Sequence, residues 1–149
     1  MRVVIQRVGK ASVRVDGEIV ASISKGLLVF LGITHDDQIE DVSWLAKKTL
    51  GLRIFSDTND VMNLSLLDVD GDMLVVSQFT LHALTKKGNR PSFIKAAPRN
   101  SAELLYEEFI NKLKSDTGIE VAKGIFGADM SVSSINDGPV TIILDTEDY

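Results

Sequence analysis

The chain has 149 residues, 44% of them hydrophobic and 25% charged, which is the balance of one globular domain and not of a disordered chain. Its formal net charge of -5 argues against a protein that coats nucleic acid non-specifically, because such binding depends on neutralising many phosphates. The absence of cysteine excludes disulfides, a thiol nucleophile and a thiolate metal site.

The first part of the chain predicts strands. Arg2–Val8 is rich in β-branched residues and predicts the first strand. Ala11–Val15 and Glu18–Ser22 predict two more, joined by Asp16-Gly17, a dipeptide typical of a tight hairpin turn. Gly26–Ile33 is apolar throughout, which indicates a strand that is buried on both faces.

A first helix is predicted over residues 38–50. Asp37 stands at the N-cap position and Glu40 follows three residues later, which is the spacing of a capping box. Apolar residues then recur at helical spacing and give the helix one face to bury. These residues are Ile39, Val42, Leu45, Ala46 and Leu50.

The middle of the chain alternates short strands with turns and ends in a loop. Leu52–Phe55 predicts a short strand, and Asp57–Asp60 predicts a turn. Asp70-Gly71 predicts a hairpin turn ahead of a strand over Met73–Thr80. Lys86–Pro98 contains glycine and proline without periodicity, as in a loop.

A second helix is predicted from an N-cap at Asn100 to a stop before Gly118. Its buried face is predicted to hold Ala102, Leu105, Tyr106, Phe109 and Leu113. Strands follow at about residues 119–123, 130–135 and 140–145. Two helices among many strands predict an α/β fold: one domain over residues 1–149, with both helices on one face of a mixed sheet and further strands packed behind it.

Several familiar active sites are missing from the sequence. It contains no Walker-type phosphate loop, no GxGxxG after a strand and no GxSxG nucleophile elbow. The two histidines, His35 and His82, do not have the spacing of a zinc site. Ser77 and His82 are an odd number of residues apart on the predicted strand, so their side chains should diverge, and we expect His82 to be exposed at the strand end.

The sequence also carries no signal of a membrane or a secreted protein. No apolar run approaches the roughly 20 residues that cross a bilayer. Residues 1–8 predict a strand and not a signal peptide. We therefore expect a cytoplasmic protein that makes no contact with a membrane.

Two polar segments at strand ends are candidates for function. Ser77–Leu81 follows a core strand, where it can deliver hydroxyls, an amide and backbone N–H groups to a ligand, or simply satisfy neighbouring backbone groups. Asn136–Thr141 lies between two predicted strands and is typical of a turn. Its Gly138-Pro139 bond is of a kind that is cis in about 5–6% of cases, so the sequence alone does not establish the isomer.

A basic run follows the first of these segments. Residues 86–99 hold five cationic residues and no acidic one: Lys86, Lys87, Arg90, Lys95 and Arg99. Such a run is either a solvated loop or a local patch that grips one end of an RNA.

Taken together, the two polar segments resemble a known family. Ser77–Leu81 matches the SQFTL motif of the D-aminoacyl-tRNA deacylases, and Asn136–Thr141 matches their NxGPVT motif. Further matches in the same order cover essentially the whole chain. They are Arg7 with Ala11-Ser12-Val13, Thr85-Lys86-Lys87-Gly88 with Arg90-Pro91-Ser92-Phe93, and Phe126-Gly127-Ala128-Asp129-Met130.

The resemblance implies an activity and an assembly. Members of the family hydrolyse the ester that joins a D-amino acid, or glycine, to the 3′-terminal adenosine of tRNA. They are homodimers with active sites at the subunit interface, they use no metal or other cofactor, and they share a three-layer α/β/β fold. The resemblance also implies that Lys86, Lys87 and Arg90 bind tRNA.

On the catalytic side, the resemblance points to Ser77, Gln78, Phe79 and Thr80. Ester hydrolysis builds negative charge on the carbonyl oxygen, so preorganised donors are needed, and the backbone N–H groups around Phe79 and Thr80 are the candidates. Ser77 would line the pocket. Thr80 has no general base beside it in the sequence, and the resemblance favours a route in which it is not acylated and the 2′-hydroxyl of the tRNA assists water.

On the substrate side, the resemblance implies a cis Gly138-Pro139 bond whose carbonyls face the active site of the partner subunit. There they would contact the α-amino group and exclude an L side chain by clash. Asn136 belongs to the same binding segment, and Arg7 and Gln78 would hold the dipeptide in place. The residues near the terminal adenosine would be Ala102, Phe126 and Met130.

Two other functions stay open. A non-catalytic module of the same fold could bind the end of tRNA through the basic loop without turnover. A plain esterase or amidase for small substrates is the other alternative, although the sequence shows no nucleophile–base pair for it.

Overall fold

The computed structural model describes residues 1–148 and contains two α-helices and two short 3-10 helices. The helices are α1 (Ile39–Gly51), α2 (Arg99–Thr117), η1 (Phe79–His82) and η2 (Thr146–Asp148). The strands are β1 (Arg2–Val15), β2 (Glu18–Ile23), β3 (Gly26–Gly32), β4 (Phe55–Ser56), β5 (Met62–Leu64), β6 (Asp72–Ser77), β7 (Val121–Lys123) and β8 (Ser131–Asp145).

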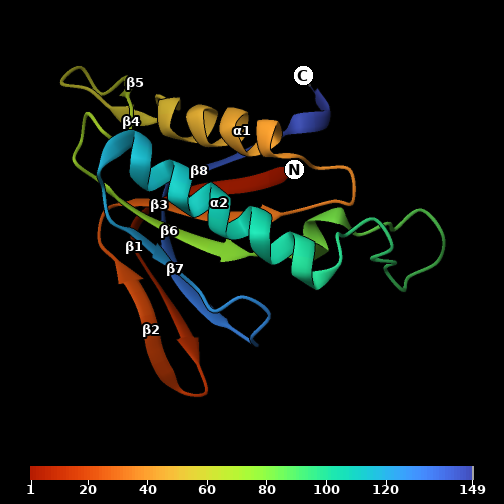
Figure 1. Ribbon diagram of the computed structural model, residues 1–149. Helices are drawn as coiled ribbons and strands as arrows, with labels where there is room; N and C mark the ends of the chain where they lie inside the picture. The colour runs from red at the N-terminus through yellow and green to blue at the C-terminus, as the bar shows by residue number, and fades with distance from the viewer. Residues whose placement is uncertain (149) are drawn as a thin grey trace.

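The main sheet is mixed and carries both α-helices on one face. Its strand order is β2-β1-β3-β6-β7, with β8 paired to β1. β3, β6 and β7 run parallel to one another, and β1 is antiparallel to its neighbours. Figure 1 shows α1 and α2 on the same side of this sheet. The predicted α/β class, with a mixed sheet and two helices on one face, is confirmed.

The long strand β1 takes part in two layers. Its residues Arg2–Val8 pair with β3, whereas Ala11–Val15 pair with β2. β8 follows β1 along nearly its whole length, and the register shifts on either side of Val8. Because extra residues in one strand of a pair bend the ladder, the second half of β1 turns away from the helices and carries β2 behind the sheet. This arrangement is the third layer of an α/β/β fold.

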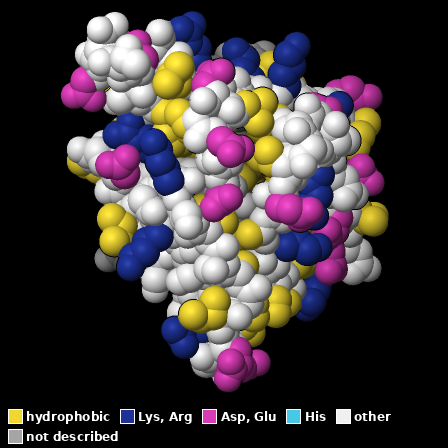
Figure 2. Space-filling view, turned by 90° about the vertical axis from the view of Figure 1, so that its left-hand side faces the viewer, with side chains coloured by type: hydrophobic (Ala, Val, Ile, Leu, Met, Phe, Trp, Pro, Cys, Tyr) yellow, Lys and Arg dark blue, Asp and Glu magenta, His cyan; other side chains and the backbone are white. Residues whose placement is uncertain are grey.

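Two hydrophobic clusters occupy the two faces of β3 and β6. On the face behind the helices, Leu28, Leu74 and Val76 pack with Val8 and Val13 of β1. The outer surface is different: the side of the molecule drawn in Figure 2 carries acidic and basic side chains interspersed, with hydrophobic side chains scattered between them. No helix within residues 1–148 is long and apolar enough to span a membrane.

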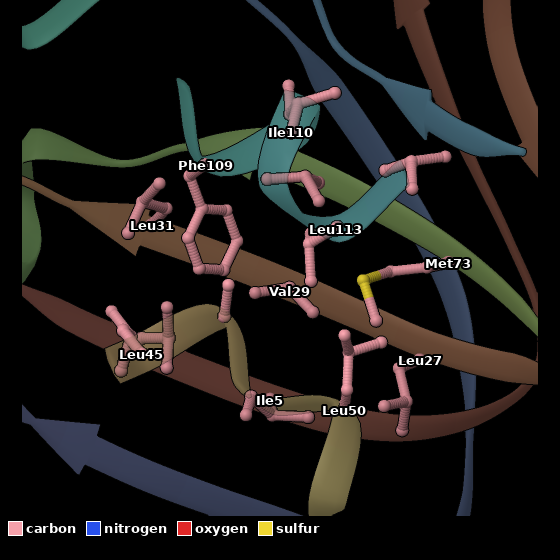
Figure 3. Close-up of a cluster of buried hydrophobic side chains, with 14 of the residues drawn as sticks. Ile5, Leu27, Val29, Leu31, Leu45, Leu50, Met73, Phe109, Ile110 and Leu113 are labelled. Atoms are coloured by element: carbon pink, nitrogen blue, oxygen red, sulfur yellow. The ribbon is translucent and has the colours of Figure 1, made fainter. Parts of the chain in front are cut away.

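The larger cluster lies between the helices and the sheet, and Figure 3 shows how its side chains meet. Strand residues alternate so that every second side chain points to the helices. The sheet supplies Ile5, Leu27, Val29, Leu31 and Met73, and the helices supply Leu45, Leu50, Phe109, Ile110 and Leu113. Burying each side chain of this kind stabilises the fold by about 1.5–3 kcal/mol, so this face holds the helices in place.

Two of the predicted turns are confirmed, at Asp16-Gly17 and at Asp57–Asp60. Asp16 and Gly17 have φ values of 50° and 86° and join β1 to β2, with Val15 opposite Glu18. These left-handed conformations are what a two-residue hairpin turn requires. In the second turn, Asp57 accepts a hydrogen bond from the backbone N–H of Asn59 at 2.8 Å.

Two breaks predicted within strands are wrong. β1 is one continuous strand from Arg2 to Val15, and β8 is one strand that runs through Asn136–Thr141. Asn136–Thr141 predicted a turn because Asn, Asp and Gly tolerate left-handed conformations and proline fixes its own φ. The pairing of β1 with β8 absorbs the irregularity as shifts in register instead.

The starts of both helices also differ from the prediction. The N-cap of α1 is Gln38, whose backbone N–H donates to the Asp41 carboxylate at 2.8 Å. Asp37 is not available as a cap because its carboxylate binds the Met1 ammonium and the backbone N–H of Thr34. The second helix has Pro98 as its N-cap and begins at Arg99, so Asn100 lies inside it. Its end at Gly118, with a φ of 72°, is confirmed.

The segment around the first polar motif is built differently from the prediction. Asp70-Gly71 does not join a hairpin, because the preceding strand β5 pairs with β4, whereas β6 pairs with β3 and β7. The strand predicted to reach Thr80 ends at Ser77, and η1 follows. The predicted alternation of side chains between two faces therefore does not extend past Ser77. The predicted strands over Leu52–Phe55 and 119–123 are shorter and shifted, at Phe55–Ser56 and Val121–Lys123.

The start of the β3–β6 pair gives a test of this packing. A methyl group on Gly26 would lie 1.9 Å from the Asp72 carbonyl oxygen and 2.7 Å from its carbon, so Gly26→Ala has to push the two strands apart. We expect it to lower the free energy of unfolding by about 2–4 kcal/mol in urea titrations.

Gly51→Ala is the matched control for this substitution. Gly51 is the last residue of α1, and an added methyl meets nothing within 4 Å. It should leave stability unchanged or raise it by up to about 1 kcal/mol, because alanine is the better helix former. An equal effect of the two substitutions would contradict the close packing at Gly26.

Candidate active site

A cavity of about 580 Å³ opens where β3, β6 and β7 end at their carboxyl termini. Ligands of sheets with parallel strands bind at this edge, and that was the expectation for Ser77–Leu81. The cavity is lined by Leu31, Ile33, Val76, Ser77, Gln78, Phe79, Phe93, Ala96, Ala97, Arg99, Ala102, Phe126, Gly127, Ala128, Asp129, Met130 and Val132. The site residues predicted from the resemblance that the structure brings together here are Ser77, Gln78, Phe79, Ala102, Phe126 and Met130.

The polar wall of the cavity begins where β6 gives way to η1. The backbone N–H of Gln78 donates to the Leu31 carbonyl at 2.8 Å, which extends the β3–β6 ladder by one bond. η1 then packs directly on Gly32. A methyl group on Gly32 would lie 3.0 Å from each of three atoms: the Gln78 carbonyl oxygen, Leu81 Cβ and His82 Cδ2. Glycine at this position therefore lets the turn lie against the end of β3.

Two backbone donors are free at the beginning of η1. In the part of the chain that the structure describes, neither the Phe79 nor the Thr80 backbone N–H donates a hydrogen bond. The first residues of a helical turn leave such N–H groups without partners inside the turn. Phe79 lines the cavity and Thr80 follows it directly, so the two free N–H groups belong to the turn at the cavity edge.

Thr80 itself does not line the cavity. Its hydroxyl oxygen accepts a hydrogen bond from the Gln78 side-chain amide at 2.5 Å. The residues around the cavity include no histidine, and the described residues contain no group of three or more His, Cys, Asp or Glu that could hold a metal. The Ser77 hydroxyl and the Asp129 carboxylate both line the cavity, but no hydrogen bond joins them in the described chain, so no nucleophile is paired with a base there.

Aromatic rings form two sides of the cavity. Phe79 is 56% exposed, and its ring meets that of Phe93 edge to face at 5.0 Å. On another side, Phe126 lies 5.5 Å from the ring of Tyr106. Tyr106 is buried and donates its hydroxyl to the Val75 carbonyl at 2.9 Å. Burial raises the pKa of Tyr106, so the hydroxyl stays protonated and acts as a structural donor.

The loop from β7 to β8 closes the cavity through two glycines. Gly124 lies so close to Met130 that an added methyl would be 2.6 Å from its sulfur. Gly127 has a φ of 73°, and the guanidinium of Arg99 lies against it, with Nη2 3.0 Å from the place of a methyl group. These contacts place Phe126 and Met130 at the cavity and bring the positive charge of Arg99 to its edge.

Phe93 and Arg99 were not predicted as site residues. Arg99 belongs to the basic run 86–99, and Phe93 belongs to one of the segments that resemble the family. Neither pattern predicts that Phe93 and Arg99 lie at the cavity, because neither indicates where the chain runs after the loop. In the structure, α2 begins at Arg99, and the start of this helix places Arg99 at the cavity.

The second polar segment lies elsewhere in the same chain. The Gly138-Pro139 bond is cis, as the resemblance implied, and both residues are exposed. Arg7 donates through Nε to the Asp137 carbonyl at 3.0 Å and through Nη1 to the Ile54 carbonyl at 2.6 Å. No residue of 136–141 lines the cavity of the described chain.

The side chain of Asn136 stabilises this segment from within. Its amide oxygen accepts the backbone N–H of Val140 at 3.0 Å, and its amide nitrogen donates to the Thr141 hydroxyl at 3.0 Å. The predicted contact of Arg7 with the segment is present. Gln78 instead donates to Thr80, and no hydrogen bond joins it to residues 136–141 of the described chain.

The cationic residues predicted to bind tRNA lie on a loop beside the cavity. Lys86, Lys87 and Arg90 are exposed and do not line it. Leu84 and Ser92 close the loop with two backbone hydrogen bonds of 2.8 and 3.0 Å. Phe93 follows directly and lines the cavity, so the loop stands next to the cavity edge, where Figure 1 shows it projecting from the body of the protein.

His82 is not exposed, contrary to the prediction. It is the last residue of η1, is 6% exposed, and its Nε2 has no hydrogen-bond partner among the described residues. Burial lowers its pKa below 6.5, and the positive charges of Arg2 and the amino terminus act in the same direction. A hydrogen bond to the backbone of Gly32 and the charge of Asp37 oppose the shift. The imidazole is therefore a neutral part of the packing beneath η1.

These features define an α/β protein whose cavity presents backbone donors and aromatic rings and holds no nucleophile–base pair. Residues 4–145 match the family described as D-Tyr-tRNA(Tyr) deacylase. The chain belongs to this family, whose members are hydrolases that act on ester bonds.

Individual relatives agree with the match. The D-aminoacyl-tRNA deacylase of Flavobacterium psychrophilum is 58% identical over 147 residues, covering 99% of this chain and 98% of the relative. That of Fusobacterium nucleatum is 60% identical over 148 residues, covering 99% and 97%. A solved structure described as c-Myc DNA Unwinding Element Binding Protein has a TM-score of 0.94 and 40% identity, covering 98% of this chain and 99% of that one. A structure described as a probable eukaryotic D-amino acid tRNA deacylase shares the fold, with a TM-score of 0.83 at 18% identity, covering 96% and 97%.

The buried His82 predicts how stability depends on pH. Because its pKa is lower in the folded chain, the unfolded chain binds more protons as the pH falls below about 6.5, and the folded state then loses stability. We expect the urea midpoint of the wild-type protein to fall between pH 7.5 and pH 5.5, and His82→Asn to flatten this dependence. His35→Asn is the control and should keep the wild-type dependence. An unchanged slope in His82→Asn would show that other groups cause it.

Proposed function

We propose that the protein hydrolyses the ester bond of D-aminoacyl-tRNA and of glycyl-tRNA, which releases the free amino acid and tRNA. The observation that carries the proposal is the cavity beyond β6, in which Ser77, Gln78 and Phe79 meet Ala102 and Phe126. It lies in a chain that is 58% identical to a protein named D-aminoacyl-tRNA deacylase.

The reaction needs donors more than it needs a side-chain nucleophile. Water adds to the ester carbonyl carbon, negative charge forms on the carbonyl oxygen, and the 3′-oxygen of the ribose leaves with a proton. The free N–H groups of Phe79 and Thr80 are suited to stabilise that charge, because fixed donors act where charge develops. The 2′-hydroxyl of the tRNA assists the attacking water, and Thr80, whose hydroxyl is bonded to Gln78, is not acylated.

The rest of the cavity suits the terminal adenosine. Phe126 offers a ring on which a base can stack, and the Met130 thioether is a polarisable neighbour for an aromatic system. Ala102, in the first turn of α2, has a small side chain and leaves room for the nucleoside. Stacking of a base on an aromatic ring contributes about 1–3 kcal/mol.

The Gly138-Pro139 dipeptide acts in the cavity of a second copy of the chain. It is exposed and held by Arg7 away from its own cavity, so within one chain it has no substrate to contact. Its strand, β8, pairs only with β1 among the named strands and exposes Ile135 and Ile143, which favours pairing with another copy. The protein is therefore a homodimer with active sites at the subunit interface.

Chirality is selected by the backbone of this dipeptide. Its carbonyl groups contact the α-amino group of the substrate and occupy the space that an L side chain needs, whereas a D side chain or glycine fits. Each 1.4 kcal/mol of such a clash gives another factor of about ten in selectivity. Gln78 of the receiving subunit helps to hold the dipeptide.

The exposed loop with Lys86, Lys87 and Arg90 grips the acceptor end of the tRNA. Its charges are clustered, while acidic and basic side chains are mixed over the face in Figure 2. A local cluster beside the cavity suits a protein of net charge -5 that holds one end of an RNA and does not coat it.

Three tRNA substrates test the proposal directly. Purified protein is incubated with D-tyrosyl-tRNA, glycyl-tRNA and L-tyrosyl-tRNA, and the remaining ester is measured over time. We expect rapid loss of the first two and persistence of the third. Persistence of all three would leave a non-catalytic tRNA-binding module, and equal loss of all three would rule out the chiral selection.

The basic loop gives a second prediction. Lys86→Gln with Lys87→Gln should raise KM for D-tyrosyl-tRNA roughly 5- to 20-fold and weaken its dependence on salt, because two phosphate contacts are lost. The value of kcat should change little. The same double variant should show an unchanged KM for D-tyrosyl-adenosine, which lacks the rest of the tRNA.

Lys47→Gln with Lys114→Gln is the matched control for this charge change. Both residues are exposed, and neither lines the cavity. Lys114 lies near the far end of α2, on the order of 20 Å along the helix from its start at the cavity. If the two double variants raise KM equally, net charge and not the loop controls binding.

A further inference from the structure

We propose that Arg2 is a positioning residue for the candidate active site. Its guanidinium ties the end of η1, and with it the N–H groups of Phe79 and Thr80, to the end of β8. The inference rests on the proposed function, because it gives Arg2 a role in the same reaction. Arg2 lines no part of the cavity and acts only through η1.

One planar side chain makes both contacts. Arg2 donates through Nε to Asp145 Oδ2 at 2.6 Å, and its Nη2 lies 2.5 Å from the same oxygen. Its Nη1 donates to the Leu81 carbonyl at 2.7 Å. The fork of N–H groups on a guanidinium serves both acceptors at once, and a lysine ammonium lacks this geometry.

Asp145 is a rigid anchor for this arrangement. It is the last residue of β8, pairs in register with Arg2, and its side chain is 6% exposed. Burial alone would raise the pKa of Asp145, but the Glu147 backbone N–H and Arg2 outweigh it and hold the pKa below the usual value. The carboxylate is therefore charged at neutral pH and keeps the guanidinium in one orientation.

The second half of η1 is held by two contacts: the buried His82 imidazole, which is bonded to the Gly32 backbone, and the guanidinium of Arg2. At its start, the Gln78 N–H is bonded to the Leu31 carbonyl, and in its middle the turn packs on Gly32. At its end, the hydrogen bond from Arg2 to Leu81 is the one that fixes the backbone to the sheet. A single 3-10 turn has poor internal hydrogen-bond geometry and does not hold its shape alone.

A small displacement of η1 would act on the rate and not on binding. Donors to a developing charge must stand where that charge forms, and a misplacement of about 1 Å costs on the order of 100-fold in rate. The substrate contacts proposed for Phe126, Met130 and the basic loop lie outside η1 and do not depend on Arg2. Loss of the tie should therefore lower kcat and leave KM unchanged.

Two substitutions separate positioning from general stability. Arg2→Lys keeps a charge beside Asp145 but cannot also serve Leu81, and we expect kcat for D-tyrosyl-tRNA to fall about 10- to 100-fold at unchanged KM. Asp145→Asn removes the buried charge but keeps an amide oxygen that can accept from the guanidinium, so Arg2 still bonds Leu81. We expect its kcat to stay within about threefold of wild type, although its Tm falls at least as far as that of Arg2→Lys.

Hydrogen exchange gives a readout that does not need activity. The backbone N–H groups of Leu81 and Ala83 are bonded to the Gln78 and Thr80 carbonyls at 3.2 and 3.1 Å. In Arg2→Lys they should exchange about tenfold faster by NMR, and in Asp145→Asn they should not.

Unchanged exchange in Arg2→Lys, or a loss of kcat that follows Tm in both variants, would overturn the positioning role. A wild-type protein that leaves D-tyrosyl-tRNA intact would defeat the proposed function instead. In that case the exchange rates alone decide whether Arg2 holds η1.

Discussion

The parallel pairing of β3 with β6 is the constraint on which the rest of the structure depends. β3 is paired on both edges and buried on both faces. The helices therefore pack on one of its faces, and the second half of β1 packs on the other. Parallel strands end at the same edge of a sheet, and the cavity opens at that edge. The bond from the Gln78 N–H to the Leu31 carbonyl continues the ladder and fixes where η1 begins. The position of the two free donors thus follows from the register of the central strands.

The elements that could be predicted are those whose signal is local. The apolar run at Gly26–Ile33, the turn at Asp16-Gly17 and the stop at Gly118 each follow from the residues themselves, and the structure has all three. Asp37 shows where local reasoning ends. It has the right spacing for an N-cap, but the ammonium of Met1 takes its carboxylate across 36 positions of sequence. The sequence pattern around Asp37 carries no information about the Met1 ammonium, which competes for the same carboxylate.

The candidate site divides in the same way. Ser77, Gln78 and Phe79 follow a core strand and could be placed at its carboxyl end from the sequence, whereas the resemblance was needed to join them to Phe126. The predicted alternation failed beyond Ser77 because Gly32 lets the chain turn into η1, and that close approach has no signature in either segment alone. The same turn buried His82, which a continuous strand would have exposed. The prediction that no Ser77–His82 pair forms the site holds for a different reason: His82 does not line the cavity.

The proposed site uses backbone groups, so its geometry depends on strand register more than on side-chain conformation. The antiparallel pair β1 and β8 carries both halves of the arrangement: Arg7 beside the Gly138-Pro139 segment, and Arg2 with Asp145 beside η1. A slip of one residue in this pair would turn every side chain to the opposite face and separate both arginines from their partners. The register is held by the core side chains of β1, such as Ile5, which pack under the helices. The pairing of β1 with β8 therefore determines the positions of the core side chains and of both polar segments. A change of register in either strand would displace both segments.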